Sequence, residues 1–600
     1  MNPSTALATV LVDELARQGV REAVLCPGSR SAPLAYALQQ ADRAGRIRLH
    51  VRVDERSAGF LALGLAKLTR RPVAVVTTSG SAVANLHPAV LEAHHGAVPL
   101  VVVSADRPPE LRGTGANQTT DQPVLFGRSL RWCHDLGAPA RGTGQNPVWR
   151  SAVSRACAAA TGALGATPGP VHLNVPLREP LVPGLEAGAA WPDSLEGREG
   201  GEPWVRTVPA SGEFGTTPAP VGSTAAPVGS TAASVGTTPA TIASPLEGAP
   251  RTLVLLGDLP DPAMASAVAD LARATGWPVV AEPFGTYDRS CVVPHGSLLL
   301  TASTWLDAHL PDRVLVVGRV TLSRAVATLL RRPGLTVEVV ATRPDWPDPA
   351  HVVSRVHGWD ALTAGVDRLT VDEAWARDWG DAGKRIAEAV DAFADDSWST
   401  GPSGLAVAST VLRGMPAGAV LFVGSSNPVR DVDLALSADD VDPATTVVAS
   451  RGLAGIDGCV STAIGIALSQ PDRPSYALMG DLTFLHDSNG LLIGPREPRP
   501  SLTIVVPNDD GGGIFTLLEP GEPGRADDFE RVFGTPTGTS IADLCRAHGV
   551  EHVRATTQGE LAQALGTPPV GIKVVEVPMP RGGHRDLHAR LRQVARAALA

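Results

Sequence analysis

The sequence predicts an α/β protein made of three successive doubly wound domains, each with a parallel sheet covered by helices on both faces. Short apolar runs rich in Val, Leu and Ala alternate with longer amphipathic segments along three stretches of the chain. Strands buried on both faces have this run-like composition, and strand–helix alternation is typical of parallel sheets. The length of 600 residues also exceeds what a single hydrophobic core supports.

The first predicted domain spans residues 1–185. Its expected strands lie at residues 23–26, 49–53, 73–77, 100–104 and 171–175, and its expected helices include residues 57–68 and 83–94. Residues 186–250 are predicted to be a flexible linker. From about residue 209 the chain is dominated by Pro, Ser, Thr, Gly and Ala, and it nearly repeats itself at residues 219–225 and 226–232. Such residues bury too little apolar area to offset chain entropy.

The second predicted domain covers residues 251–365, and the third covers residues 401–600. Their expected strands lie at residues 253–256, 279–281, 314–317 and 337–340, and at residues 420–423, 446–449, 476–479, 502–506 and 573–577. Residues 366–400 are predicted to connect the two domains as a helix, because residues 371–393 show an amphipathic pattern.

Composition excludes several classes of protein. The net charge of -10 argues against a nucleic-acid-binding surface. The six cysteines are scattered and form no C-x-x-C pair, which favours reduced thiols in the cytoplasm over a disulfide framework or a zinc site. No basic stretch leads into an apolar segment at the start, so we expect no signal peptide. No apolar window reaches the roughly 18 residues of a membrane span.

Two acidic residues of the third domain follow predicted strands, Asp481 in Gly-Asp-Leu-Thr and Asp509 in Asn-Asp-Asp-Gly-Gly-Gly. Open α/β sheets bind ligands at this edge, and carboxylate oxygens suit a hard ion such as Mg²⁺. The glycines allow backbone groups to approach phosphates, and a helix expected from about Leu485 favours negative charge at its start. Either Asp alone is more often a helix cap. The combined pattern predicts a site for a divalent cation and a diphosphate.

Glu55 lies between a predicted strand and a helix rich in Ala, Gly and Leu. Apolar surroundings favour the protonated form of a carboxyl group, which could then exchange a proton with a ring nitrogen. The alternatives are a helix cap or a surface ion pair with Arg52 or Arg56.

Two turns of the first domain, at residues 26–31 and 78–81, combine Gly with Ser. Arg30 in the first of these turns is an unusual choice near a positive helix N-terminus, and unless it is exposed it requires an anion. Arg107, Arg430 and Arg451 also follow predicted strands. Singly, each is most often a surface ion-pairing residue. Together they predict a substrate with more than one carboxylate, since guanidinium binds carboxylate bidentately.

These residues resemble the thiamine-diphosphate enzymes of the pyruvate-oxidase-like group, and most closely the 2-succinyl-5-enolpyruvyl-6-hydroxy-3-cyclohexene-1-carboxylate synthases of menaquinone biosynthesis. The motifs that carry the resemblance lie at residues 26–34 (Cys-Pro-Gly-Ser-Arg-Ser-Ala-Pro-Leu), 54–56 (Asp-Glu-Arg), 78–86, 105–111 (Ala-Asp-Arg-Pro-Pro-Glu-Leu), 115–118 (Gly-Ala-Asn-Gln), 450–452, 455–458 (Gly-Ile-Asp-Gly) and 511–515 (Gly-Gly-Gly-Ile-Phe). They span nearly the whole chain apart from the linker.

The resemblance implies a pyrimidine-binding, a central and a diphosphate-binding domain, in that order. Asp481, Asp509 and the carbonyl of Gly511 would bind Mg²⁺ or Mn²⁺. Thiamine diphosphate would contact Pro27, Gly28, Glu55, Ser79, Gly80, Ser425, Ser426, Ile456, Gly480, Asp481, Leu482, Thr483, Asp509, Ile514 and Phe515. The substrates would contact Ser29, Arg30, Arg107, Asn117, Gln118, Arg324, Arg430, Arg451, Ile514, Phe515 and Leu518. Catalytic roles are implied for Glu55, Arg30, Arg107, Asn117, Gln118, Arg430 and Arg451.

The implied reaction is decarboxylation of 2-oxoglutarate, followed by conjugate addition of the resulting succinyl carbanion to isochorismate. A homodimer or a dimer of dimers is implied, with each site at a subunit interface. Three departures stand out. Leu482 follows Asp481 where the wider group often has Gly, although Leu also occurs there in this synthase family. Asp509 replaces the usual Asn, which leaves Asn508 or Asp509 as the cation ligand, and Ser323 stands where a Lys is often found.

Three other functions compete with this one. Another thiamine-diphosphate lyase, such as a simple 2-oxoacid decarboxylase or an acetolactate synthase, would share the cofactor motifs. A catalytically silent regulatory paralogue is a second alternative, and the presence of Glu55, Asp481 and Asp509 argues against it. A nicotinamide or flavin enzyme is a third, but no predicted strand is followed by G-x-G-x-x-G and a later acidic residue.

Overall fold

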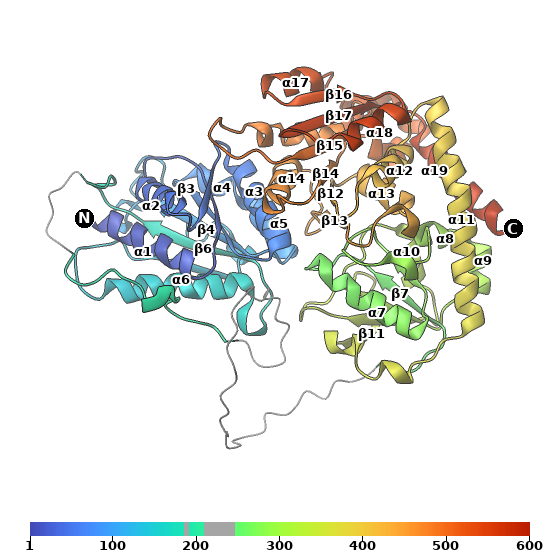
Figure 1. Cartoon of the computed structure of the whole chain (residues 1–600), viewed down its shortest axis with the longest axis horizontal. Helices are drawn as coiled ribbons and strands as arrows, with labels where there is room; N and C mark the ends of the chain where they lie inside the picture. Colours follow the sequence, from blue (N-terminus) through green and yellow to red (C-terminus); the bar gives the residue numbers. More distant parts are fainter. Residues whose placement is uncertain (185–190, 209–245) are drawn as a thin grey trace.

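The computed structural model describes residues 1–184, 191–208 and 246–600, apart from the side chain of Thr400. We call residues 1–208 the first block, residues 246–372 the central block and residues 401–600 the third block. Each block is built around one parallel sheet, so the three-sheet α/β prediction is confirmed. In Figure 1 the first block lies at the left, the third at the upper right and the central block at the lower right, and the long helix α11 (Glu373–Thr400) runs beside the last two.

The first block has a six-stranded sheet of order β2-β1-β3-β4-β6-β5. Alternate residues of its buried strands point to opposite faces, so one face packs on α1, α2 and α6 and the other on α3 and α5. Its elements are β1 (Glu22–Leu25), β2 (Arg48–Val51), β3 (Val73–Thr77), β4 (Leu100–Asp106), β5 (Trp132–Asp135), β6 (Pro170–Pro176), α1 (Pro3–Arg17), α2 (Ala32–Arg43), α3 (Glu55–Thr69), α4 (Ser81–Ala84), α5 (His87–His95) and α6 (Gln145–Thr161).

The central block has a five-stranded sheet of order β11-β10-β9-β7-β8. Helix α7 covers one face, and α8, α10 and α11 cover the other. Its elements are β7 (Thr252–Leu256), β8 (Val279–Ala281), β9 (Arg313–Val317), β10 (Thr336–Val340), β11 (Val353–His357), α7 (Ala265–Thr275), α8 (Gly296–Leu299), α9 (Ser303–Ala308) and α10 (Arg324–Leu330).

The third block has a six-stranded sheet of order β13-β12-β14-β15-β17-β16, which repeats the topology of the first block strand for strand. Helices α12, α13, α18 and α19 contribute to one core, and α14, α15 and α17 contribute to the other. Its elements are β12 (Val420–Val423), β13 (Thr446–Ala449), β14 (Ser475–Leu478), β15 (Leu502–Asn508), β16 (Glu551–Arg554), β17 (Ile572–Pro578), α12 (Gly404–Gly414), α13 (Asn427–Ala435), α14 (Cys459–Ser469), α15 (Asp481–His486), α16 (Ala526–Phe529), α17 (Ile541–Ala547), α18 (Gln558–Gly566) and α19 (His584–Leu599).

Each sheet contains one strand that the sequence pattern did not predict, namely β5, β11 and β16. All three lie at a sheet edge. Their side chains are half-buried or exposed, so they lack the apolar run that marks the central strands. Two helix predictions also need correction. The expected helix at residues 83–94 is divided into α4 and α5, and α15 begins at Asp481 instead of near Leu485.

Part of the predicted linker packs on the first block. Trp191 lies 6.1 Å from Trp149, measured between ring centroids, and the Trp204 N–H donates to Glu14 at 2.7 Å. Residues 191–208 therefore extend the first block, and a linker from 186 to 250 is too long. The near-repeat at residues 219–232 lies outside the described residues.

Helices α3 and α14 pack closely and join the first block to the third through a shared core. A Cβ atom on Gly64 would lie 2.2 Å from the carbonyl oxygen of Thr462, and one on Gly465 would lie 2.4 Å from that of Leu61. Backbone fills this space on both sides, so only glycine permits the crossing.

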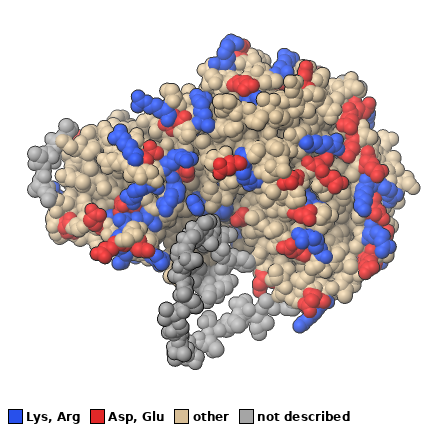
Figure 2. All heavy atoms as spheres, viewed as in Figure 1, with Lys and Arg blue, Asp and Glu red and all other residues tan. Residues whose placement is uncertain are grey.

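Acidic and basic side chains are intermixed over the face shown in Figure 2. Within the described residues, no helix combines the length and the apolar character that crossing a membrane requires.

Candidate active site

A cavity opens at the carboxyl edge of the third sheet, beyond β12, β14 and β15. Of the residues predicted to bind a cofactor, it collects Ser426, Ile456, Gly480, Asp481, Leu482, Thr483, Asp509, Ile514 and Phe515, together with Gly511. Asp431 and His584 also line it, and neither belongs to a predicted motif. These residues come from five separate segments, and parallel strand ends bring them to one place.

Asp481 and Asp509 face this cavity as an acidic pair. Asp481 is the first residue of α15, and its Oδ2 atom accepts the Gly511 N–H at 2.7 Å. Burial, and then the charge of Asp509, raise the pKa of Asp481 to about 7. Two carboxylates held together out of water are costly unless a cation or a proton neutralises one of them.

Asn508 is engaged elsewhere. Its Nδ2 atom donates to Glu576 at 2.7 Å, and its Oδ1 atom accepts the Asp510 N–H at 3.0 Å. Asp509, by contrast, lines the cavity. Of the two candidates left open by the sequence, Asp509 is the one that faces Asp481.

His584 and Asp431 complete the charged wall of the cavity. The Nε2 atom of His584 lies 3.0 Å from Oδ2 of Asp509. Burial lowers the pKa of His584, but the hydrogen bond to Asp509 and the nearby carboxylates outweigh it and raise that pKa. Burial also raises the pKa of Asp431 to about 7. His584 thus offsets the extra negative charge that Asp509 brings in place of Asn.

The described residues contain no group of three or more His, Cys, Asp or Glu side chains placed to hold a metal ion. A cation between Asp481 and Asp509 would therefore need backbone carbonyl and ligand oxygens as well, which Mg²⁺ accepts. Two glycines keep this space open. A Cβ on Gly513 would lie 2.0 Å from Oδ2 of Asp509, and one on Gly511 would lie 2.1 Å from the Gly534 carbonyl oxygen.

The turn after β12 has the properties of a phosphate-binding turn. The Ser425 Oγ and Asn427 Oδ1 atoms are buried without a hydrogen-bond partner among the described residues. Ser426 has a φ of 79°, a conformation that non-glycine residues hold only when their surroundings enforce it. Backbone strain and unpaired polar atoms at a sheet edge fit a turn that is completed by a polar ligand.

A second cluster of predicted residues lies in the first block. Arg107 donates to the Ser79 hydroxyl, and the Gln118 side chain donates to the Ser79 carbonyl at 2.9 Å. Arg30 donates to the Leu177 carbonyl at 3.0 Å, while its Nε atom is buried without a partner among the described residues. Burial, and then the charge of Arg30, lower the pKa of Arg107. Two neighbouring guanidinium groups with spare donors indicate an anion site.

In the described part of the chain, the remaining predicted residues of the first block form no hydrogen bond with Arg30 or Arg107. Gly28 packs against Thr78, and the Gly80 N–H donates to Gln122 at 2.9 Å. Pro27, Ser29 and Asn117 are exposed. Their contacts within a single chain do not define a role for them.

Glu55 is the first residue of α3 and is half-buried. The alternatives considered for it do not apply. Asp54 caps the helix, Arg52 pairs with Glu497 at 3.5 Å, and Arg56 donates to the His486 carbonyl at 2.6 Å. The Glu55 carboxylate therefore remains available. The apolar enclosure expected for it is incomplete within one chain.

A third cluster joins the central and third blocks. Arg430 donates to the Ser426 carbonyl at 2.6 Å, and Arg451 donates to the Thr321 hydroxyl at 2.7 Å. Burial lowers the pKa of Arg430, and the charges of Arg451 and Arg324 lower it further. Three arginines close enough to affect one another suit a substrate with several carboxylates.

These clusters do not form one cavity within the chain. No described residue of the first block lines the cavity beyond β12, β14 and β15, and Leu518 and the arginines Arg324, Arg430 and Arg451 lie outside its lining. The sequence motifs predicted one site. Within a single chain, the residues predicted for that site lie in separate clusters.

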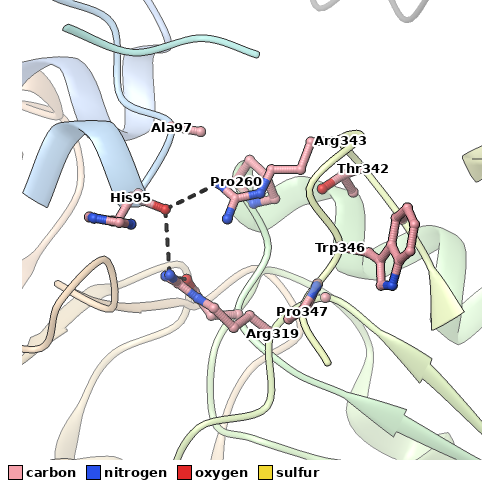
Figure 3. A pocket seen from close by; sticks show the side chains of 12 residues that line it. His95, Ala97, Pro260, Arg319, Thr342, Arg343, Trp346 and Pro347 are labelled. Carbon is pink, nitrogen blue, oxygen red and sulfur yellow. Dashed lines mark hydrogen bonds and ion pairs between the residues drawn. The ribbon is translucent and has the colours of Figure 1, made fainter. Parts of the chain in front are cut away.

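A separate pocket lies between the first and central blocks, and none of the predicted site residues lines it. Figure 3 shows Arg319 and Arg343 directed at the carbonyl oxygen of His95, with donor–acceptor distances of 3.5 and 3.4 Å. Arg319 also donates to the Gly452 carbonyl at 3.2 Å. The pocket wall therefore touches the loop that carries Arg451.

Comparisons with known proteins identify what this chain is similar to. Residues 5–125 match the family model described as "Thiamine pyrophosphate enzyme, N-terminal TPP binding domain", and residues 435–568 match the corresponding C-terminal domain. The crystal structure of benzoylformate decarboxylase from Polynucleobacter necessarius superposes with a TM-score of 0.63, covering 97% of this chain and 99% of that chain. Its sequence identity is 16%, so it shows a shared fold alone.

Relatives named 2-succinyl-5-enolpyruvyl-6-hydroxy-3-cyclohexene-1-carboxylate synthase match the chain from end to end. The protein of Saccharopolyspora erythraea is 47% identical over 601 residues, with 100% of both chains covered. That of Kineococcus radiotolerans is also 47% identical with 100% of both covered, and that of Rhodococcus opacus is 46% identical with 99% of both covered. Similarity of this extent shows that the chain belongs to the family of thiamine-diphosphate-dependent 2-succinyl-5-enolpyruvyl-6-hydroxy-3-cyclohexene-1-carboxylate synthases.

Proposed function

We propose that this chain decarboxylates 2-oxoglutarate and adds the resulting succinyl unit to isochorismate, releasing CO₂ in a step of menaquinone biosynthesis. The observation that carries the proposal is the acidic pair Asp481 and Asp509 facing a cavity with a strained, unsatisfied turn at Ser425–Asn427. The full-length match to the named synthases supports the choice of substrates.

The third block, residues 401–600, is proposed to hold the diphosphate end of the cofactor. Asp481, Asp509 and the Gly511 carbonyl would bind Mg²⁺ or Mn²⁺, whose charge neutralises the acidic pair. Ser425, Ser426, Leu482 and Thr483 would lie beside the phosphates, where strand ends and a turn present donors. Residues 251–365 are proposed as the central domain, with residues 366–400 leading from it into the third block.

Residues 1–185, within the first block, are proposed to hold the pyrimidine end. Thiamine diphosphate, when bound, supplies the carbon nucleophile and the electron sink for loss of CO₂. The free carboxyl group of Glu55 would exchange a proton with a ring nitrogen of the cofactor. Ile456, Ile514 and Phe515 would give the cavity an apolar wall that excludes water.

The arginine clusters are proposed to bind the two acids. Arg30 and Arg107 lie together with Gln118 in the first block, and Arg324, Arg430 and Arg451 lie together between the other two blocks. Bidentate carboxylate binding would orient each acid. Asn117, Ser29 and Leu518 would contact the substrates only once the site is complete.

We further propose that two chains complete each site, as a homodimer or a dimer of dimers. The cavity of the third block contains no described residue of the first block, and Glu55 is half-buried without an ion-pair partner among the described residues. A second copy that presents its first block to this cavity would bring Glu55 to the diphosphate end. A cytoplasmic location is proposed from the six cysteines, all of which are free thiols.

The test is CO₂ release from 2-oxoglutarate by the purified protein, with and without thiamine diphosphate, Mg²⁺ and isochorismate. We expect release that needs both cofactors and rises sharply with isochorismate, and Glu55→Gln should abolish it. Cofactor-dependent release that ignores isochorismate would indicate a simple decarboxylase. No release and no cofactor binding would indicate a silent paralogue.

A further inference from the structure

The loop that carries Arg451 is enclosed by three parts of the molecule. Arg451 follows β13 in the third block and is only 6% exposed. Its guanidinium donates to Thr321 of the central block at 2.7 Å. The next two backbone N–H groups, of Gly452 and Leu453, donate to Glu92 of the first block, each at 2.7 Å. A side chain proposed to bind substrate is thus oriented by residues of the two other blocks.

Glu92 holds the loop on one side. It lies on α5, is 5% exposed, and offers one carboxylate oxygen to each of two consecutive N–H groups. A Cβ atom on residue 452 would lie 2.7 Å from the Glu92 carboxyl group, so Gly452 is required for this approach. Leu453 is 54% exposed, so its side chain contributes little to anchoring the loop.

Glu282 holds the opposite side in the same manner. It follows β8, is 7% exposed, and its Oε1 atom accepts the N–H groups of Thr321 and Leu322, the latter at 2.7 Å. The Thr321 hydroxyl accepts the hydrogen bond from Arg451. The segment that contains Thr321 leads into α10, which begins at Arg324. This one buried acid therefore holds a loop that touches two of the three clustered arginines. Arg451 donates to the loop, and Arg324 follows it at the start of α10.

Glu92 and Glu282 differ in their surroundings, since burial raises the pKa of Glu92 against the charge of the buried Lys67, which lowers it. Neither Glu92 nor Glu282 forms an ion pair within the described residues, and the Glu282 Oε2 atom has no hydrogen-bond partner there. Burial raises the pKa of Glu282 to about 8, despite the two N–H groups that lower it. Burial of an acidic side chain without a salt bridge is costly for stability, which is a common mark of functional positions.

We propose that Glu92 and Glu282 are positioning residues that hold the Arg451 guanidinium in place for a substrate carboxylate, by anchoring the backbone on either side of it. The inference deepens the proposed function and rests on it. Arg451 contacts the acid, and the glutamates act only through Arg451 and Thr321.

The geometry predicts different results for the two amide substitutions. Glu92 uses both oxygens, so Glu92→Gln would turn an NH₂ group toward a backbone N–H and break one bond. Glu282 uses Oε1 for both bonds, so Glu282→Gln keeps them, whereas Glu282→Ala removes them. We expect Glu92→Gln and Glu282→Ala to raise the KM for isochorismate or for 2-oxoglutarate on the order of ten- to a hundredfold, as misplaced binding groups do. Glu282→Gln should change it little.

The decisive experiment repeats Glu92→Gln and Glu282→Ala in an Arg451→Ala background, with the cofactor-loaded enzyme and with KM, kcat and Tm recorded. If the glutamates act through Arg451, their added effect on KM disappears in that background. Equal added losses in both backgrounds, or a Tm change with no change in KM, would overturn the proposal. Glu338→Gln is the matched control, since Glu338 is a buried central-block glutamate that pairs with Arg313 and His357 and touches neither loop.

The same assay separates this inference from the proposed function. Absence of isochorismate-dependent CO₂ release in the unmodified protein would overturn the proposed function. Normal release in the unmodified protein with unchanged KM in Glu92→Gln would overturn the positioning role alone.

Discussion

The two ends of the candidate site are built in different ways. The proposed diphosphate end belongs to one sheet, whose strands β12, β14 and β15 each deliver a short motif to the same edge. The proposed acid-binding end around Arg451 is bordered by hydrogen bonds that involve Glu92, Thr321 and Glu282 from two other blocks. A site on one sheet can be recognised from contiguous motifs, whereas a site between blocks depends on residues that carry no motif. The predictions below test this contrast from the largest expected effect to the smallest.

Removal of one carboxylate should disable the diphosphate end by itself. Asp481→Asn keeps the shape but removes the charge that a cation would neutralise. We expect the affinity for thiamine diphosphate with Mg²⁺ to fall at least about a hundredfold, because even residues that merely orient metal ligands contribute about 10- to 100-fold. Titration calorimetry measures this affinity. Asp510→Asn is the control, since Asp510 accepts the N–H groups of Thr537 and Gly538 outside the cavity. Unchanged affinity in Asp481→Asn would refute the assignment.

A substitution where α3 crosses α14, at the contact between the first and third blocks, should lower stability. Gly64→Val would place methyl groups against the Thr462 carbonyl oxygen, where even a Cβ atom would lie at 2.2 Å. We expect the free energy of unfolding to fall by about 3 kcal/mol or more, at the upper end of overpacking effects. Urea denaturation followed by circular dichroism measures it. Gly380→Val, inside helix α11 at a position with no neighbouring atom within 4 Å and no positive φ, is the control for replacing a helical glycine with valine. Equal losses in both variants would show that the tight crossing is not the cause.

The buried acids predict how stability depends on pH. The pKa of Glu282 is raised to about 8, and those of Asp431 and Asp481 to about 7, each mainly by burial. Buried histidines such as His172 and His588, whose pKa values burial lowers, oppose the effect of these acids on stability below about pH 6.5, the ordinary pKa of histidine. From about pH 6.5 to about 8 the folded chain retains protons on these acids that the unfolded chain has released, so stability falls as pH rises over that range. We expect Tm of the cofactor-free protein to decrease over this range, and to decrease less with thiamine diphosphate and Mg²⁺ present. A Tm that rises over this range would contradict these shifts.

The smallest expected effect is a change in stability on relieving the strained turn after β12. Ser426 has φ 79° and ψ -137°, a region that glycine occupies without strain. Ser426→Gly should stabilise the cofactor-free protein by about 1 kcal/mol, the lower end of the cost of such strain. Thermal unfolding measures the gain. Ser403→Gly, which removes a helix-capping hydroxyl at ordinary φ, should destabilise it instead. A loss of stability in Ser426→Gly would mean that the serine side chain contributes more than the strain costs.

The central strands could be predicted because burial on both faces requires an apolar run. Strands β3, β8, β12 and β13 occupy the residues predicted for them. The edge strands β5, β11 and β16 could not, because a half-exposed strand has no such run. The start of α15 at Asp481 was missed because Gly480 and Asp481 also suit a loop.

Predictions about the site divide in the same way. Asp481, Asp509 and the glycines after them follow strands within short motifs, and the structure brings them into one cavity. His584 could not be predicted, because it reaches Asp509 across 75 residues from the start of α19. Glu92 and Glu282 were missed for the same reason, since each contacts a loop that is distant in the chain.

The sequence by itself determined the three-sheet architecture and the family, because burial periodicity and short motifs are local properties of the chain. Only the tertiary structure decided that Asp509 faces the cavity while Asn508 turns to Glu576, and that two buried glutamates accept backbone N–H groups of the loops that carry Arg451 and Thr321. The physical reason is that a buried carboxylate must find donors wherever the packed chain provides them. Those donors are backbone N–H groups, which every residue except proline carries and which leave no trace in the sequence.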